Sequence, residues 1–204
     1  MTRTIGIFGF DDVELLDLAG PYEVFTCASR VSARITPGAE VPFKVVTIGQ
    51  SMGPLRARAG LGLLPDADCA NHPAVDVLII PGGVVTAELT KPEVIAWITS
   101  TAARCELVTS VCTGAFLLAQ AGLLTGKRAT THWEDMDDLQ AMFPQVRVQA
   151  QRRWLRDGNT VTSGGISAGI DMSLHLVETL VNRELAVRTA RQMEYTWNES
   201  AQPM

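Results

Sequence analysis

One cysteine lies at the junction between a strand pattern and a helix pattern. The run Glu106–Val111 has the composition of a buried strand, Thr113–Ala121 has a helical pattern, and only Cys112 separates them. A side chain at such a junction is presented above the sheet, next to the N–H groups and the positive dipole end of the helix. These groups stabilise a thiolate, so we expect Cys112 to have a lowered pKa and to act as a nucleophile. The alternative is that Cys112 is a small buried apolar residue, as most free cysteines are.

An acid occupies an apolar stretch near the start of the chain. Asp17 lies between Leu16 and Leu18, an unusual place for a carboxylate that only meets water. Burial raises the pKa of a carboxyl group, which can then hold or relay a proton near a thiolate. The same residue can also cap the helix that begins here. We therefore expect Asp17 to exchange protons with Cys112, to cap a helix, or to do both.

Other cysteine, histidine and serine residues lack the partners that a site requires. Cys69 and His72 resemble half of a zinc site, but the sequence contains no second half. The run Gly165–Gly169 matches the G-x-S-x-G elbow of α/β-hydrolases, whose mechanism needs an acid and then a histidine downstream. The only later histidine, His175, lies about two turns along the same helix pattern and cannot reach back to Ser167. We expect Ser167 to be a helix N-cap.

Short β-rich runs alternate with helical patterns along the rest of the chain. The expected strands are Arg3–Phe8, Phe43–Ile48, Val75–Ile80, Glu106–Val111 and Thr160–Ser163. The expected helices are Leu15–Ala28, Pro92–Arg104, Thr113–Ala121, Glu134–Met142, Ala168–Val181 and Glu184–Trp197. The stretch Arg147–Asn159 has the pattern of a hairpin with its turn at Asp157-Gly158-Asn159. Strand-then-helix alternation predicts a doubly wound α/β sheet in which most strands are parallel.

Three of the expected strand ends carry chemically useful residues. They are Pro81-Gly82-Gly83, Cys112-Thr113-Gly114 and Ser163-Gly164-Gly165. In open α/β sheets, ligands bind beyond the carboxyl ends of the strands. We therefore expect these three segments to line one shared pocket.

The composition is that of a single globular domain over residues 1–204. Hydrophobic residues make up 47% and charged residues 19% of the chain, and the formal net charge is −5. This charge disfavours a nucleic-acid partner, since phosphate neutralisation needs clustered Lys and Arg. The four cysteines are far apart, so we expect reduced thiols in a cytoplasmic protein, with Cys27, Cys69 and Cys105 structural. The sequence shows neither a signal-peptide pattern nor an apolar run of membrane-spanning length, so no membrane partner is expected.

Several motifs together resemble the ThiJ/PfpI superfamily, and more closely its isocyanide hydratase branch. They are Leu16-Asp17-Leu18-Ala19-Gly20-Pro21, Ile80-Pro81-Gly82-Gly83, Thr109-Ser110-Val111-Cys112-Thr113-Gly114, Gly126-Lys127-Arg128-Ala129-Thr130-Thr131-His132-Trp133, Arg156-Asp157-Gly158-Asn159, Gly164-Gly165-Ile166-Ser167-Ala168-Gly169-Ile170-Asp171 and Gln192-Met193-Glu194-Tyr195. The resemblance spans nearly the whole chain. It implies a flavodoxin-like three-layer sandwich with a mostly parallel sheet, a cysteine nucleophile elbow and a homodimer.

The resemblance also implies a reaction and the residues that perform it. In isocyanide hydratases, a cysteine attacks the terminal carbon of R–N≡C, and water then releases the N-substituted formamide. Carried over, Cys112 is the nucleophile, Asp17 the acid/base, and Thr113 a pocket hydroxyl. The backbone at Gly82 and Gly83 would line the pocket, with the Gly83 N–H, and that of Thr113, facing developing negative charge. No metal or organic cofactor is implied, and the expected partner is a small-molecule substrate.

One departure, one undecided residue and two alternatives accompany this interpretation. Peptidase-like members of the superfamily place a histidine directly after the nucleophile, where this chain has Thr113, so we do not expect a peptidase. His132 is left either as a pocket residue or as a loop or interface residue. AraC-type regulators carry a domain with very similar motifs, so a sensor domain is one alternative; the chain stops at Met204 without a helix-turn-helix region, so we expect no direct binding to DNA. The other alternative is a redox or stress protein that uses Cys112 as an oxidisable thiol.

Overall fold

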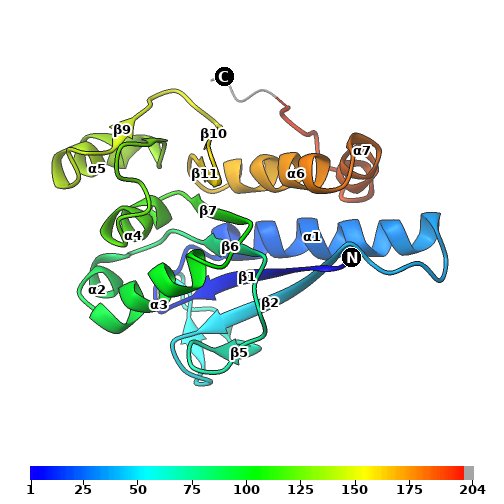
Figure 1. Cartoon of the computed structure of the whole chain (residues 1–204), viewed down its shortest axis with the longest axis horizontal. Helices are drawn as coiled ribbons and strands as arrows, with labels where there is room; N and C mark the ends of the chain where they lie inside the picture. Colours follow the sequence, from blue (N-terminus) through cyan, green and yellow to red (C-terminus); the bar gives the residue numbers. More distant parts are fainter. Residues whose placement is uncertain (200–204) are drawn as a thin grey trace.

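The computed structural model describes residues 1–199 and is built around one large sheet (Figure 1). Its strands are β1 (Arg3–Gly9), β2 (Phe43–Gly49), β5 (Ala67–Asp68), β6 (Val77–Ile80), β7 (Leu107–Val111), β10 (Trp154–Asp157) and β11 (Thr160–Ser163). The strand order is β10-β11-β7-β6-β1-β2-β5, and every neighbouring pair is parallel except β10 with β11. The predicted α/β class and the mostly parallel sheet are confirmed.

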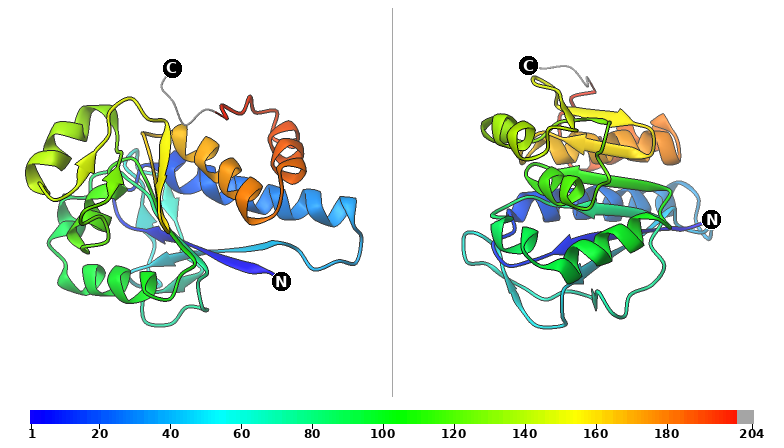
Figure 2. Two further views of the ribbon diagram at one scale, coloured as in Figure 1. Left: turned by 45° about the horizontal axis from the view of Figure 1, so that its top comes forward. Right: turned by 60° about the vertical axis from the view of Figure 1, so that its left-hand side comes forward.

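The central strands are buried throughout because helices cover both of their faces. All residues of β6 and β7 are buried, as expected of parallel strands packed on two sides. On one side lie α1 (Leu15–Ile35), α6 (Ala168–Leu180) and α7 (Arg183–Gln192), which pack on one another. On the other side lie α2 (Thr86–Leu89), α3 (Pro92–Ala102), α4 (Gly114–Gln120) and α5 (Met136–Met142) (Figure 2). The result is the flavodoxin-like sandwich that the sequence predicts.

The strand register brings the carboxyl ends of the central strands together. Ile80 of β6 pairs with Ser110 of β7, and Ser163 of β11 pairs with Val111 of β7. The three segments that follow these strands therefore emerge at the same edge of the sheet, as predicted. This edge holds the candidate site.

Some element boundaries differ from the predicted ones. The hairpin predicted over Arg147–Asn159 is wrong in its first half, because β9 (Arg147–Val148) pairs in parallel with β8 (Arg128–Ala129). The hairpin that exists joins β10 to β11 across Gly158 and Asn159. The helix predicted over Glu184–Trp197 ends at Gln192, since Glu194 adopts a φ of 49°, outside the helical region. A further short pair, β3 (Leu55–Arg56) with β4 (Gly62–Leu63), was not predicted.

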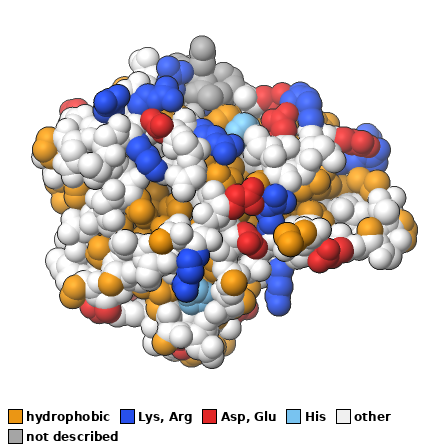
Figure 3. All heavy atoms as spheres, in the orientation of Figure 1, with side chains coloured by type: hydrophobic (Ala, Val, Ile, Leu, Met, Phe, Trp, Pro, Cys, Tyr) orange, Lys and Arg blue, Asp and Glu red, His pale blue; other side chains and the backbone are white. Residues whose placement is uncertain are grey.

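The surface carries its basic side chains unevenly. On the face drawn in Figure 3, Lys and Arg side chains gather near β9 and β10, where Arg147, Arg152 and Arg156 are exposed. The chain as a whole has a net charge of −5, so acidic side chains must predominate elsewhere. No helix within residues 1–199 is both long and apolar enough to cross a bilayer.

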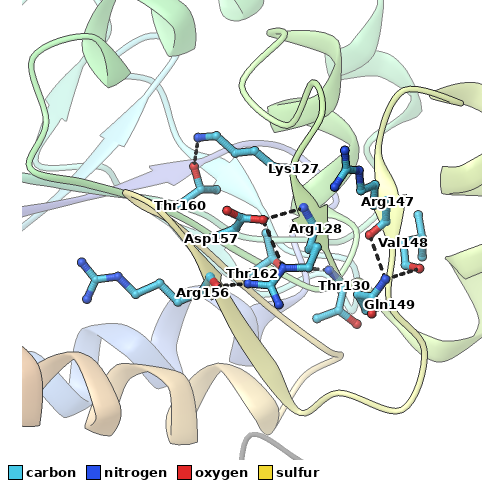
Figure 4. A network of polar contacts seen from close by, with 10 residues as sticks. All are labelled: Lys127, Arg128, Thr130, Arg147, Val148, Gln149, Arg156, Asp157, Thr160 and Thr162. Atoms are coloured by element: carbon cyan, nitrogen blue, oxygen red, sulfur yellow. Dashed lines mark hydrogen bonds and ion pairs between the residues drawn. The ribbon is translucent and has the colours of Figure 1, made fainter.

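Hydrogen bonds fasten the β8–β9 pair to the edge of the large sheet (Figure 4). The Arg128 N–H donates to the Asp157 carboxylate at 2.9 Å, and the Thr130 N–H donates to Thr162 Oγ1 at 2.9 Å. Lys127 Nζ adds a bond of 2.6 Å to Thr160 Oγ1. These bonds fix the segment that leads into Thr131 and His132 at the carboxyl edge of β11.

Candidate active site

Cys112 occupies a sharp elbow between β7 and α4. Its φ is 54°, a left-handed conformation that non-glycine residues seldom adopt. The next helix begins at Gly114, where a Cβ would overlap the carbonyl oxygen of Ile80. The Cys112 N–H faces the carbonyls of Ser163 and Gly164, each at 3.2 Å. The elbow predicted from the strand–helix junction is therefore present, and the third strand end packs directly against it.

Asp17 is the buried acid beside this cysteine. It lies in the first turn of α1 and is 0% exposed. Its Oδ2 accepts the Gly82 N–H at 3.1 Å, while Oδ1 has no hydrogen-bond partner of regular geometry among the described residues. The Cys112 thiol and the backbone of Ile166 lie near enough to interact with the carboxyl group. The structure thus brings together the two residues that the sequence singled out.

Burial sets the proton affinity of Asp17. Desolvation raises the pKa of this carboxyl group to about 7, and the nearby Glu14 carboxylate acts in the same direction. Hydrogen bonding by the Gly82 N–H and by the Cys112 thiol opposes the rise in pKa. A carboxyl group of this kind can both accept and donate a proton near neutral pH.

The pKa of Cys112 differs from the expectation. The sequence predicted a lowered pKa, but burial raises the pKa of this thiol to about 12, and the negative charges of Asp17 and Asp135 add to the rise. The Thr113 backbone and hydroxyl favour the thiolate, but their effect is smaller. The side chain is only 7% exposed, so water contributes little to stabilising a thiolate. The resting sulfur is therefore a thiol, and it needs a base to become a nucleophile.

Thr113 and the two glycines form a second layer of hydrogen bonds. Thr113 Oγ1 accepts the Gly83 N–H at 2.9 Å and donates to the Gly83 carbonyl at 2.8 Å. The Gly83 N–H is thus taken up by Thr113, and the Gly82 N–H donates to Asp17, so neither N–H is free to bind a substrate. The role predicted for the Gly83 N–H is therefore wrong. The Thr113 N–H lies next to the sulfur, as expected. The glycines hold the acid and the hydroxyl in place.

A cavity of about 450 Å³ opens onto Cys112, a volume suited to a small molecule. Its apolar lining comes from Val84, Val85, Leu89, Phe116, Met142 and Ile166. Its polar lining comes from Glu14, Arg58, Gly83, Thr86, Cys112, Thr113, His132, Glu134, Asp135 and Asp138. Many of these residues were not predicted, because they lie in loops or on helices whose packing decides which side chains face the cavity.

His132 lies in the cavity wall, one of the two places that the sequence left open. Its ring packs directly on Gly165, where a Cβ would overlap it. Its Nδ1 lies 3.3 Å from an Asp135 carboxylate oxygen and accepts the Glu134 N–H at 3.4 Å, so that His132 also caps a short 3₁₀ helix, η1 (Trp133–Asp135). His132 is therefore both a wall residue and a structural cap.

The residues set aside in the sequence have structural roles. His72 accepts a hydrogen bond of 3.0 Å from the Trp97 indole, and no group of residues within 1–199 has the composition of a metal site. Burial raises the pKa of Cys69 to about 12 and that of Cys105 to about 11. Ser167 is the N-cap residue of α6 as predicted, but its hydroxyl makes no capping bond and instead accepts from Arg153 at 3.1 Å.

Comparison with known proteins places the chain in a family. The DJ-1/PfpI family matches residues 3–179. The chain belongs to the DJ-1/PfpI family. A solved ThiJ/PfpI structure from Pseudomonas syringae is 29% identical and covers 100% of this chain and 78% of its own, with a TM-score of 0.84. Drosophila melanogaster DJ-1beta, at 19% identity and a TM-score of 0.81, shares the fold.

Relatives within the DJ-1/PfpI family have different functions. An isonitrile hydratase of Pseudomonas putida is 37% identical over 196 residues, which cover 96% of this chain and 79% of the relative. The HTH-type transcriptional regulator GbdR of Pseudomonas aeruginosa is 32% identical over 193 residues. That match covers 95% of this chain but 51% of the regulator, so the chain spans about half of the regulator's length. The family therefore includes both enzymes and regulators with close sequence similarity to this chain.

Proposed function

We propose that this DJ-1/PfpI protein hydrates isocyanides to N-substituted formamides, with Cys112 as the nucleophile and Asp17 as the acid/base. The observation that carries the proposal is the pairing of a thiol on an elbow with a buried carboxyl group whose pKa is about 7. The 37% identity to an isonitrile hydratase over 96% of the chain supports it. The mechanism uses side chains and water alone.

The first step adds the thiol across the terminal carbon of the isocyanide. The Asp17 carboxylate takes the proton of the Cys112 thiol as the sulfur attacks that carbon, which forms the C–S bond. The protonated Asp17 then returns the proton to the same carbon and yields the thioimidate R–N=CH–S–Cys112. Because Asp17 has a pKa of about 7, it can both accept and return a proton near neutral pH. The proton leaves the thiol as the C–S bond forms, since a thiol with a pKa of about 12 does not ionise on its own at this pH.

The second step releases the product with water. The Asp17 carboxylate takes a proton from a water molecule, whose oxygen attacks the thioimidate carbon, and the nitrogen receives the proton. Collapse of the tetrahedral intermediate breaks the C–S bond and gives R–NH–CHO, with the thiol restored by the remaining proton. The Thr113 N–H, which lies next to the sulfur, would stabilise the thiolate as it forms and leaves. The atoms balance as one isocyanide and one water per formamide.

A turnover assay tests the proposal. Purified chain is incubated with cyclohexyl isocyanide, and N-cyclohexylformamide is followed by chromatography. We expect turnover in the wild type and in Cys105→Ala, a matched control cysteine away from the cavity, and loss in Cys112→Ala and Asp17→Asn. Absence of formamide, or formamide production undiminished in Cys112→Ala, would overturn the proposal.

A sensor domain is the second candidate, and the observation that favours it is the 32% identity to a transcriptional regulator over 95% of the chain. In that case the cavity binds its ligand without turnover. Ligand-induced thermal stabilisation that is equal in the wild type and Cys112→Ala, with no formamide formed, would favour it. A redox role is less well supported, because burial and the raised pKa of Cys112 leave little thiolate for oxidants to attack.

We also propose that the protein is a homodimer, as the resemblance to the ThiJ/PfpI superfamily implies. Light scattering coupled to size-exclusion chromatography measures the mass directly. The expected result is twice the chain mass of 22.0 kDa, and a monomer mass at micromolar concentration would contradict it.

A further inference from the structure

The cavity over Cys112 carries more negative than positive charge. Its acidic lining residues are Glu14, Glu134, Asp135 and Asp138, and its basic ones are Arg58 and, when protonated, His132. Arg58 lies 3.9 Å from Glu14, so these two charges offset each other. His132 Nδ1 lies between Glu134 at 3.7 Å and Asp135 at 3.3 Å, and it can offset at most one of them. Asp138 forms no ion pair with the described residues.

Several acidic side chains elsewhere on the molecule, by contrast, have a basic partner. On the face drawn in Figure 3, several acidic side chains lie beside Lys or Arg. Elsewhere on the helices, Glu23 pairs with Arg30 at 2.6 Å and Glu184 with Arg188 at 2.7 Å. The carboxylates at the cavity have no comparable set of basic partners.

The innermost part of the cavity is apolar. Val85 and Phe116 are buried, like Cys112, whereas Glu134 and Asp138 are exposed at the opening together with Val84, Ile166 and Met142. A molecule that places its reacting carbon at the sulfur therefore meets an apolar wall first and carboxylates toward the opening. The influence of this acidic opening extends to the reacting atom, since the charge of Asp135 contributes to the raised pKa of Cys112.

We propose that the molecules converted at Cys112 carry a positively charged ammonium group at the end remote from the reacting carbon. This inference rests on the proposed isocyanide hydration and names the class of isocyanide that the cavity selects. The apolar middle of the molecule contacts Phe116 and Ile166, and the ammonium group lies near Asp135 and Asp138. The same carboxylates repel molecules that carry a carboxylate at that end.

The test compares three isocyanides of similar length: n-butyl, 3-(dimethylamino)propyl, which is protonated near pH 7.5, and 3-isocyanopropanoate. At low ionic strength, kcat/KM is expected to be roughly five- to tenfold higher for the ammonium compound than for the butyl compound. For the carboxylate compound, it is expected to be lower by a similar factor. Salt at 0.5 M should shrink both ratios, because the cavity opening is accessible to counterions.

Variants assign the effect to the cavity. In Asp135→Asn/Asp138→Asn the ratio between ammonium and butyl substrates should fall toward one, whereas Asp137→Asn, on the same helix but outside the lining, should keep it. The ratio is the readout, because the Asp135 change also alters the pKa of Cys112 and thus the rate on every substrate. Equal kcat/KM for the three wild-type substrates, or a ratio unchanged in the double variant, would overturn the inference.

A binding measurement separates failure of this inference from failure of the proposed function. Calorimetry compares two unreactive formamides, N-(3-dimethylaminopropyl)formamide and N-butylformamide. Tighter binding of the charged compound, weakened in Asp135→Asn/Asp138→Asn, supports the charge preference even when no isocyanide is hydrated. Equal binding, or no binding of either formamide, contradicts it.

Discussion

Thr113 Oγ1 holds Gly83 at both of its backbone groups, accepting the N–H at 2.9 Å and donating to the carbonyl at 2.8 Å. One hydroxyl thus fixes the loop after β6 against the elbow after β7. Its neighbour Gly82 donates to Asp17 at 3.1 Å, so the position of the acid depends on the same loop. The hydroxyl of Thr113 is therefore a positioning group for the loop.

Replacing Thr113 tests this relationship. Thr113→Val keeps the shape of the side chain but leaves the N–H and the carbonyl of Gly83 unpaired. The loss of these hydrogen bonds costs about 1–3 kcal/mol of free energy. We expect kcat/KM for isocyanide hydration to fall roughly tenfold or more in Thr113→Val. Thr113→Ser retains the hydroxyl and should stay within about threefold of the wild type. Equal activity in the valine and serine variants would show that the hydroxyl has no positioning role.

The pH profile of the reaction should follow Asp17. The first step needs the carboxylate of Asp17 and the thiol of Cys112, whose pKa values are about 7 and about 12. As the pH falls below 7, Asp17 becomes protonated, so kcat/KM should drop about tenfold for each pH unit and level off above about pH 8. Initial rates between pH 5 and 9 measure this. A flat profile over that range is the result that excludes Asp17 as the base.

Asp17→Asn should make the protein more stable at high pH while it abolishes activity. The folded state raises the pKa from 3.8 to about 7, so the native state binds the proton more tightly than the unfolded chain does. The buried carboxylate therefore destabilises the fold above pH 7. This penalty shrinks as the pH falls from 7 toward 4, and it is absent below 4. Its full size is on the order of 2–4 kcal/mol.

Chemical denaturation at pH 8 and pH 4 checks this linkage. The free energy of unfolding of Asp17→Asn should exceed that of the wild type by more at pH 8 than at pH 4. Glu23→Gln, which changes an exposed acid on the same helix, should show no such difference. If Asp17→Asn raises the free energy of unfolding equally at both pH values, the charge of Asp17 is not the cause of the stabilisation.

Gly114 tests the packing of the elbow. A Cβ at this residue would overlap the carbonyl oxygen of Ile80, which is backbone and cannot move aside alone. Gly114→Ala should destabilise the protein by about 1–3 kcal/mol and reduce turnover. Gly62→Ala, where a Cβ would meet nothing within 4 Å, is the matched control. It should change neither the stability nor the turnover appreciably. Thermal melts and the turnover assay together measure the two effects, and wild-type behaviour of Gly114→Ala would contradict the elbow geometry.

The sequence predicted the parts of the site that local pattern determines. Cys112 could be found because a strand pattern meets a helix pattern with no other residue between them. Asp17 could be found because leucines flank a carboxylate. The parallel sheet followed from the alternation of strands and helices, and with it the meeting of three strand ends at one edge.

Other features depend on packing that no local pattern reveals. The direction of the Cys112 pKa shift was wrong because burial, a property of the whole fold, outweighs the start of a seven-residue helix. The Gly83 N–H was expected to face the substrate, but a residue 30 positions away accepts its hydrogen bond. Asp135 and Asp138 were missed because the sequence does not show which side of α5 and its preceding turn faces the cavity.

The acid comes from the start of the chain and the elbow from its middle, and the backbone of Ile166 approaches that acid from a third segment that follows β11. The proposed pairing is therefore a property of the finished tertiary structure: a chain that has formed its helices but not yet docked α1 against the loop after β6 has a cysteine without its base. During refolding, recovery of turnover should lag behind recovery of helical signal and coincide with the docking of α1 on the sheet.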